Sequence, residues 1–448
     1  MGLLPNETSK SKKNRSTKLS TTKLSTWLPT NFFPNLPREI WILVSGQLFL
    51  YIGQGFTLVY SSIFFVNQLG FSPTQVGIAL SASGFSGLFA RFLAGCAIDS
   101  RYLGRRGTLL LASLTCSLAC LCLAFANTFP LLVAGNLLMG TGVSLYWPAT
   151  LAVTADLSTD NNRSEAYALS QLSNNLGMGL GALLAGEYIA LHGSYQALFL
   201  GKGLVYFLFG WLIWWAIAET RQKETTLTQV AKNWGSALRD YKLVIFLIAN
   251  TFFALYGAQL SSTLPLYLAN FIPSGNTALG FSEQLISYLF FWHALIKIIG
   301  QIPIVRLTKQ IDYASVLLFT LVAWASSAAF FWLTGVTSAN AVVIALAGFF
   351  LVAIAEILYG PAASALVGEL APPEQRGIYF SLESECWAVG FLIGPAMGGW
   401  ALDHPVVWGG NLWLVLVAST GIPGMILLYL KQLLTQKEAD IKNADAQA

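Results

Sequence analysis

Charged residues are what this sequence lacks most. Only 10% of its 448 residues are Asp, Glu, Lys or Arg, whereas 55% are hydrophobic, and the mean hydropathy is +0.61. Soluble globular domains carry roughly 25% charged residues, because a surface in contact with water needs them. The charges here are too few to cover a molecule of this size. A soluble globular protein is therefore excluded, and lipid is the expected solvent.

Histidine and cysteine are scarce as well. The His-Glu-x-x-His, Gly-x-Ser-x-Gly and P-loop motifs are missing from the sequence. Cys116, Cys120 and Cys122 lie in an apolar stretch with no acid or histidine nearby, which favours helix packing over a metal site. The three histidines are dispersed: His192, His293 and His404. We therefore expect no enzyme activity, no cofactor, no metal and no nucleic-acid partner.

Long apolar stretches dominate the chain instead. A helix needs about 20 apolar residues to cross the hydrocarbon core of a bilayer. Twelve stretches of about that length lie near 40–66, 74–98, 107–126, 130–154, 166–190, 196–217, 243–270, 283–305, 313–334, 341–367, 378–401 and 410–430. The sequence thus predicts an all-α membrane protein with twelve transmembrane helices.

Lys and Arg are unevenly distributed among the connections. They occur in the tail before the first stretch and after every even-numbered stretch. The other connections contain neither: 67–73, 127–129, 191–195, 271–282, 335–340 and 402–409. Cytoplasmic loops collect Lys and Arg, so both termini are predicted to be cytoplasmic. The Ser-, Thr- and Lys-rich tail reads as disordered, with a transit peptide as the alternative.

The second half of the chain repeats the first. Pro148 and Arg163 recur as Pro361 and Arg376, and 361 − 148 and 376 − 163 both equal 213. Glycines of the fifth and eleventh stretches share this offset: Gly177, Gly181 and Gly186 match Gly390, Gly394 and Gly399. Small residues at such spacing let helices approach closely in lipid. The predicted domains are a tail (1–38), a six-helix bundle (39–217), a linker (218–241), a second bundle (242–430) and a C-terminal tail (431–448).

The loop after the second stretch reads Gly95-Cys-Ala-Ile-Asp99-Ser-Arg101-Tyr-Leu-Gly104-Arg105-Arg106. It resembles the signature loop of the major facilitator superfamily, with two extra residues between the Asp and the Gly. The resemblance covers essentially everything after the tail. It implies two six-helix bundles that move a solute by alternating access. Asn136 stands where proton-linked members often carry Arg, and the glycine pattern typical of antiporters is complete only in the eleventh stretch.

Acidic and basic residues around this loop suggest a latch between the halves. Ion pairs there would form in one conformation and break in another, although a solvated anchor is the alternative. The candidates are Asp99, Arg91, Arg101, Arg105, Arg106, Asp156 and Arg163. The corresponding loop 305–309 of the second half carries no acid, so the latch is expected to be asymmetric.

Ionisable residues inside membrane helices are costly and usually functional. Glu356, Glu383 and Glu385 are the candidate proton carriers, and Glu356 has pairing with Lys297 as its alternative role. Lys202 and Glu187, near helix ends, are expected to extend toward the membrane surface.

A cavity for an organic solute also needs neutral polar and aromatic groups. Gln47, Tyr51 and Gln54 form one stripe on the first helix, because their spacing of four and three residues keeps them on one face. The further candidates are Trp147, Gln171, Asn174, Asn175, Tyr256, Gln259 and Tyr359. Bonds between helices are the alternative role for several of them.

The sequence therefore predicts a monomeric secondary active transporter in the bilayer, in the cytoplasmic membrane of a bacterium. We expect a small-molecule substrate, proton coupling and a preference for efflux of amphipathic compounds. Sugar or metabolite uptake and ligand sensing without transport are the alternatives.

Overall fold

The structure is a computed structural model. It describes residues 36–100, 102–159, 162–219, 234–273, 280–337, 340–372 and 375–447, and for Asp99, Ser164 and 437–447 it describes the backbone alone. The predicted tail before residue 36, Arg101 and most of the predicted linker lie outside the described residues.

The first half is built from helices throughout its described part. The first span starts as α1 and continues through a short helix and a π-helical turn. The elements are α1 (Arg38–Leu58), α2 (Tyr60–Ile63), η2 (Phe64–Gln68), α3 (Pro73–Asp99), α4 (Gly104–Ala124), α5 (Phe129–Leu157), α6 (Arg163–His192) and α7 (Tyr195–Ala216).

The second half repeats this order. Its elements are α9 (Tyr241–Asn270), α10 (Glu283–Thr308), α11 (Tyr313–Val336), α12 (Ala341–Leu370), α13 (Arg376–Asp403), α14 (Asn411–Ser419) and α15 (Gly421–Gln447). Each of the predicted apolar stretches overlaps a helix or a run of consecutive helices. The repeat is visible in the elements themselves, since α6 begins at Arg163 and α13 at Arg376.

Local sequence signals explain several helix boundaries. Ser72 and Gln75 form a reciprocal capping box at the start of α3, and Pro73 occupies its first position. The Ser72 side chain accepts a hydrogen bond from an amide that has no partner inside the helix, and Pro73 has no amide hydrogen that would need one. Gly193, with φ of 68°, ends α6 in the left-handed conformation that glycine adopts without strain.

Ten segments within the described residues are long and apolar enough to cross a membrane. The helices α6 and α13 are just as long, at 30 and 28 residues, but do not reach that standard. The reason lies in their composition, because they carry many of the polar and acidic candidates named above. These two helices occupy equivalent positions in the two halves, since α6 and α13 are related by the internal repeat.

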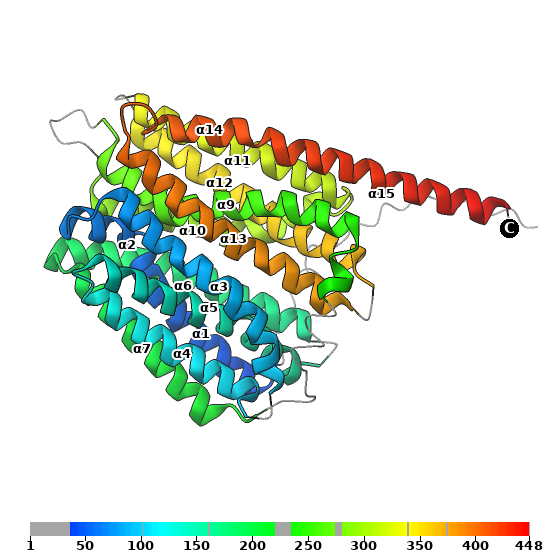
Figure 1. The fold of residues 1–448 in the computed structure, drawn as a ribbon, viewed down its shortest axis with the longest axis horizontal. Helices are drawn as coiled ribbons and strands as arrows, with labels where there is room; N and C mark the ends of the chain where they lie inside the picture. The colour runs from blue at the N-terminus through cyan, green and yellow to red at the C-terminus, as the bar shows by residue number, and fades with distance from the viewer. Residues whose placement is uncertain are drawn as a thin grey trace, which may run out of the picture. The chain divides into compact units, whose positions relative to one another are not determined.

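We name the two ends of the bundle by the charge of their connections. The basic end carries the Lys- and Arg-containing connections, and the neutral end carries those without Lys or Arg. The two halves meet along two pairs of long helices, α3 with α13 and α6 with α10. Figure 1 shows α3 in light blue alongside α13 in orange. We call these contacts the α3–α13 seam and the α6–α10 seam.

The repeated glycines pack in an equivalent way in both halves. On α6, a Cβ at Gly181 would overlap backbone atoms of α1, and on α13 a Cβ at Gly390 would come within 2.5 Å of the backbone of Ala254 on α9. The last glycine of each set, Gly186 or Gly399, instead faces the other half. The predicted close approach of these helices is therefore present in the structure.

Candidate transport site

Three ionisable side chains come together inside the second half. His293 and Lys297 lie one turn apart on α10, and Glu356 lies opposite them on α12. The Oε2 atom of Glu356 is 2.7 Å from Nζ of Lys297 and 3.2 Å from Nε2 of His293. Removing charges from water is costly, and close opposite charges offset part of that cost. Glu356 thus makes the ion pair with Lys297 that was one of its two predicted roles, and His293 joins it.

Glu383 on α13 belongs to a hydrogen-bonded network with α9 and α12. Its carboxylate accepts bonds from the Tyr359 hydroxyl at 3.4 Å and from the Asn250 amide at 3.5 Å. The Tyr359 hydroxyl also lies 2.8 Å from Oδ1 of Asn250. Asn250 is completely buried, so its side chain depends on these partners. The network joins three helices of the second half around one carboxylate.

Glu385 lies on α13 close to the first half. Among the described residues its two carboxylate oxygens have no hydrogen-bond partner, although both are buried. Arg91 of α3 lies nearby and donates to the backbone oxygen and the hydroxyl of Ser384, the latter at 2.9 Å. Arg91 therefore links the halves. The side chain of Asp99 is not among the described residues, so a contact between Arg91 and Asp99 stays a prediction.

The predicted stripe of α1 is present and lies against helices of its own half. Gln47 is 1% exposed, and the Tyr51 ring packs edge-on against Trp147 of α5, with ring centroids 6.2 Å apart. Gln54 donates a hydrogen bond to the hydroxyl of Tyr206 on α7. A role of this stripe in lining a solute cavity stays a prediction.

The polar residues of α6 differ in their surroundings. Asn174 is buried and donates to Oε1 of Gln171 at 3.2 Å, whereas Gln171 itself is exposed and Asn175 is half-buried. Since Gln171 is exposed about two turns into α6 from the basic end, α6 offers an accessible polar group in that region.

Tyr256 and Gln259 of α9 contact other helices of the second half. The Tyr256 hydroxyl lies 3.0 Å from the hydroxyl of Ser419, and Gln259 donates to the backbone oxygen of Gly394 at 2.8 Å. Both residues also line a small, mostly apolar cavity between α9, α11 and α14. They stabilise the packing of this half in the conformation described.

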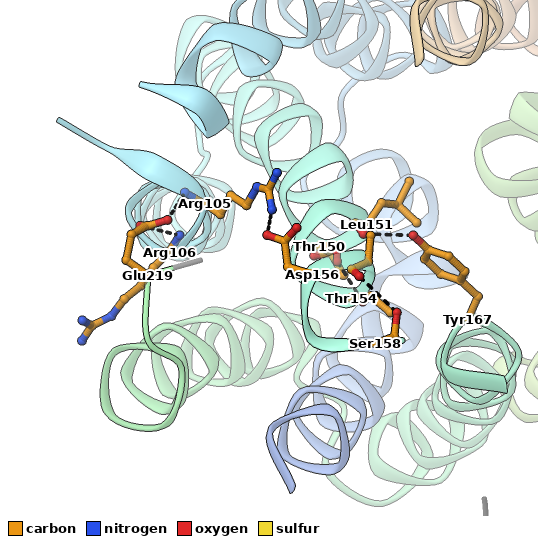
Figure 2. Close-up of polar contacts among 10 residues, drawn as sticks. Arg105, Arg106, Thr150, Leu151, Thr154, Asp156, Ser158, Tyr167 and Glu219 are labelled. Carbon is orange, nitrogen blue, oxygen red and sulfur yellow. Dashed lines mark hydrogen bonds and ion pairs between the residues drawn. The ribbon is translucent and has the colours of Figure 1, made fainter. Parts of the chain in front are cut away.

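Figure 2 shows the contacts at the basic end of the first half. Arg105 on α4 forms an ion pair with Asp156 on α5. The carboxylate of Glu219 accepts hydrogen bonds from the backbone amides of Arg105 and Arg106, at 3.0 and 3.2 Å. The first amides of a helix lack partners within the helix and, with the helix dipole, favour an anion. These contacts connect elements of one half. Arg163, another of the predicted latch residues, is the first residue of α6.

The basic end of the second half has a related arrangement. Asp312 precedes α11, accepts a hydrogen bond from the backbone amide of Ser315 at 2.9 Å, and lies 3.3 Å from Nζ of Lys431. Partial burial raises the pKa of Asp312, but the Ser315 and Lys431 contacts outweigh it and hold that pKa below its usual range. The stretch 305–309 carries no acid, and Asp312, three residues further on, supplies the carboxylate at this end.

Polar contacts also join the halves at the neutral end. The Tyr60 hydroxyl donates to the backbone oxygen of Glu283 at 2.9 Å, and the Tyr195 hydroxyl donates to the Glu283 carboxylate at 2.9 Å. Glu187 of α6 accepts from the hydroxyl of Tyr288 on α10. These bonds hold α2, α6 and α7 against α10, so the neutral end of the α6–α10 seam is closed in this structure.

The sequence analysis misplaced one functional candidate and did not identify two others. Lys202 was expected to extend to the surface, but it is 6% exposed and donates to Thr57 on α1 at 2.8 Å, so that expectation was wrong. Glu219 and His293 were not singled out as contacts of these clusters. For His293 a signal existed, because it lies four residues before Lys297 and therefore on the same helix face.

The chain matches the model of the Major Facilitator Superfamily over residues 43–272 and 268–447. It belongs to this superfamily and is an integral, multi-pass membrane protein. It is 25% identical over 426 residues to a Na(+), Li(+), K(+)/H(+) antiporter of Planococcus maritimus, with 88% of this chain and 96% of the relative covered.

Two further comparisons agree with that assignment. The multidrug resistance protein MdtH of Edwardsiella ictaluri is 26% identical over 396 residues, with 86% of this chain and 93% of the relative covered. The crystal structure of the nucleoside transporter NupG (D323A mutant) has a TM-score of 0.73 at 13% identity, with 88% of this chain and 99% of the other covered. At that identity the last likeness shows the fold alone.

Proposed function

We propose that this protein is a secondary active transporter that exports a small amphipathic organic solute in exchange for protons. Twelve helices span the membrane, with α6 and α13 included, and both termini face the cytoplasm. The protein works as a monomer by alternating access in the cytoplasmic membrane of a bacterium. The uneven distribution of Lys and Arg between the connections supports this orientation.

The ion cluster of Glu356, Lys297 and His293 carries the proposal of proton coupling. Charges inside a membrane bundle are costly and are kept where they mark an ion or proton path. Protonation of Glu356 would remove its charge and weaken its 2.7 Å contact with Lys297. The packing of α10 against α12 would then depend on the proton, which is what a coupled transporter needs.

Glu383 and Glu385 are the second candidates for the same role. Glu385 adjoins the α3–α13 seam, and its carboxylate oxygens have no hydrogen-bond partner among the described residues. A change in its protonation would change the charge next to Arg91, which links the halves. The exposed Gln171, with Asn174 and Asn175 on α6, supplies polar groups for the solute on the other side of the interface.

The preference for export rests on the relatives. One bears the name of a multidrug resistance protein and another that of a cation/proton antiporter. The first name describes resistance to many drugs and the second describes exchange of cations for protons, and each describes that relative alone. Aromatic groups such as Trp147 and Tyr51 suit an amphipathic solute, because aromatic faces bind apolar and cationic groups.

The test is the accumulation of a panel of fluorescent amphipathic dyes in pump-deficient bacteria that express the protein, with and without a protonophore. We expect lowered accumulation that the protonophore restores. Glu356→Gln should abolish this extrusion, whereas Glu369→Gln, an exposed carboxylate on the same helix, should leave it intact. Unchanged accumulation of every dye would contradict drug export and favour metabolite uptake or ligand sensing.

A further inference from the structure

Lys202 is a buried cation that the proposed coupling cluster does not use. It lies on α7, about 10 Å from the neutral end at 1.5 Å per residue from Tyr195. Its side chain is packed between α1 and α4 and bonds to Thr57. Because it is 6% exposed, its amine does not reach the membrane surface. The position therefore differs from that of a lysine at the end of a membrane helix.

No carboxylate faces this lysine among the described residues. The helices α4 and α7 contain no Asp or Glu at all, and α1 contains only Glu39, near its opposite end. The titratable groups that face Lys202 are the thiols of Cys116 and Cys120 on α4. On its own helix the nearest is the phenol of Tyr206, and α1 contributes the neutral hydroxyl of Thr57. Lys297 in the second half, in contrast, has Glu356 at 2.7 Å.

An ammonium group without a counter-charge is costly to bury. A proton that leaves the amine removes that cost, whereas a thiol or a phenol does not supply a negative charge of its own. Lysine amines exchange protons in proteins where burial changes their environment, and arginine does not. The surroundings of Lys202 thus favour a group that exchanges its proton rather than one that keeps a fixed charge.

A stripe of polar side chains runs from Lys202 to the middle of α1. Thr57, Gln54, Tyr51 and Gln47 recur every three or four residues and span about 15 Å. At the far end of the stripe, Oε1 of Gln47 and the hydroxyls of Tyr146 and Thr150 form a buried polar group whose members interact with one another without well-formed hydrogen bonds. Buried polar atoms in this state commonly bind ordered water.

We propose that Lys202 is a proton-binding site of the first half, with water along this polar stripe as its proton acceptor. In the protonated state Lys202 is an ammonium group, and on deprotonation its proton passes to a water molecule and leaves a neutral amine. The site complements Glu356, so that each half carries an exchangeable proton. Its role in coupling rests on the proposed function, whereas proton binding itself does not.

The first experiment measures proton binding without transport. Purified protein in detergent is titrated from about pH 6 to about pH 9 against the variants Lys202→Arg and Lys202→Met, at matched protein concentrations. Arg keeps its proton over this range, and Met has none to lose. We expect the wild-type protein to release a proton that neither variant releases. Superimposable titration curves would overturn the proposal, whether or not any dye is transported.

The second experiment uses proteoliposomes loaded with ethidium. With a proton gradient we expect both variants to lose gradient-driven ethidium movement, while exchange of ethidium without a gradient continues. A merely structural charge would be restored by Lys202→Arg, so gradient-driven transport by that variant would overturn the coupling role. A failure of the proposed function would appear in the wild-type protein, which would then move no ethidium in either mode.

Discussion

The two seams between the halves are equivalent by the internal repeat but are packed differently. In the α3–α13 seam the backbones themselves touch. A Cβ at Gly84 would lie 2.6 Å from the backbone oxygen of Ala388, and one at Gly77 would overlap the backbone oxygen of Pro395. In the α6–α10 seam the glycines face side chains, since Gly179 meets the Cβ of Ala294.

The seams also differ in length. Along α6 and α10 the contacts step by seven residues, from Gly186 with Ser287 to Gly179 with Ala294. One more step would pair Leu172 with Gln301, but Leu172 is 47% exposed there. The α3–α13 seam, in contrast, is bonded near both ends, by Thr74 to Asp403 and by Arg91 to Ser384. The α6–α10 seam is thus closed at the neutral end and open toward the basic end.

This difference indicates which seam moves. Separating α3 from α13 would break contacts from Thr74 to Arg91 on α3 and from Ser384 to Asp403 on α13. The backbone contacts in this seam cannot adapt by rotating a side chain. Separating α6 from α10 at the neutral end requires breaking a shorter set of contacts. We therefore expect the halves to rotate about the α3–α13 seam while the α6–α10 seam opens and closes.

Cross-linking of the seams should have the largest effect, and its outcome should distinguish the α3–α13 seam from the α6–α10 seam. A disulfide between Gly179→Cys and Ala294→Cys is expected to abolish dye transport completely, because α6 and α10 must part there. A disulfide between Gly87→Cys and Ala388→Cys should leave most transport intact. The Cβ–Cβ distance of 3.7 Å at this second pair matches the geometry of a disulfide.

The cross-links are made in a background whose five cysteines are replaced and whose transport is verified. The reduced form of each double variant serves as its own control. Loss of transport in both oxidised variants would show that both seams part during the cycle, and the proposed difference between them would then be wrong.

Substitution of the glycines should have the next largest effect. Gly84→Ala places a methyl group against the backbone of α13 and should lower stability by about 1–3 kcal/mol, the usual range for overpacking. Gly179→Ala, which meets a side chain, should cost less. Gly95→Ala on α3 meets nothing within 4 Å and should stabilise the protein by about 0.5–1 kcal/mol. Thermal unfolding in detergent measures all three, and equal losses at Gly84 and Gly179 would contradict the comparison.

The helices themselves and their repetition could be predicted from the sequence, because both depend on local composition. The offset of 213 residues between Arg163 and Arg376 reappears as the common start of α6 and α13. The glycines of these helices could be predicted too, because small residues at helical spacing indicate close packing whatever the neighbour is. The choice of neighbour could not, since Gly77 and Gly84 look like ordinary residues of an apolar helix.

The site was less predictable for a related reason. The burial of Lys202 depends on Thr57, 145 residues away, and the Glu219 contact joins residues 114 apart. Single-sequence patterns report the face and depth of a residue on its own helix. They do not report which side chain of another helix meets it, so the partner of Glu356 was foreseeable only as one of two alternatives.

Removal of hydrogen bonds at the neutral end should have moderate effects on stability and opening, and these effects should differ between the two seams. Tyr60→Phe removes the bonds to the backbone of Glu283 and to the hydroxyl of Ser287, and should destabilise the closed state by about 1–3 kcal/mol at 0.5–1.5 kcal/mol per bond. Thr74→Val removes a bond in the α3–α13 seam and should lower stability without opening the neutral end. Alkylation of Gly179→Cys by an impermeant maleimide measures the opening, and faster labelling in Thr74→Val would count against a fixed seam.

Ser384→Ala should have the smallest effect. It removes the hydroxyl that accepts a bond from Arg91 at 2.9 Å, but the backbone oxygen of Ser384 still accepts from the same guanidinium. The loss of stability should therefore stay within about 1 kcal/mol, and dye transport should persist. Both are measured beside Arg91→Leu, which removes every bond of this contact and should cost more stability. If Ser384→Ala stopped transport while the protein stayed folded, the basic end of the α3–α13 seam would have to rearrange during the cycle, and this seam would no longer be the fixed one.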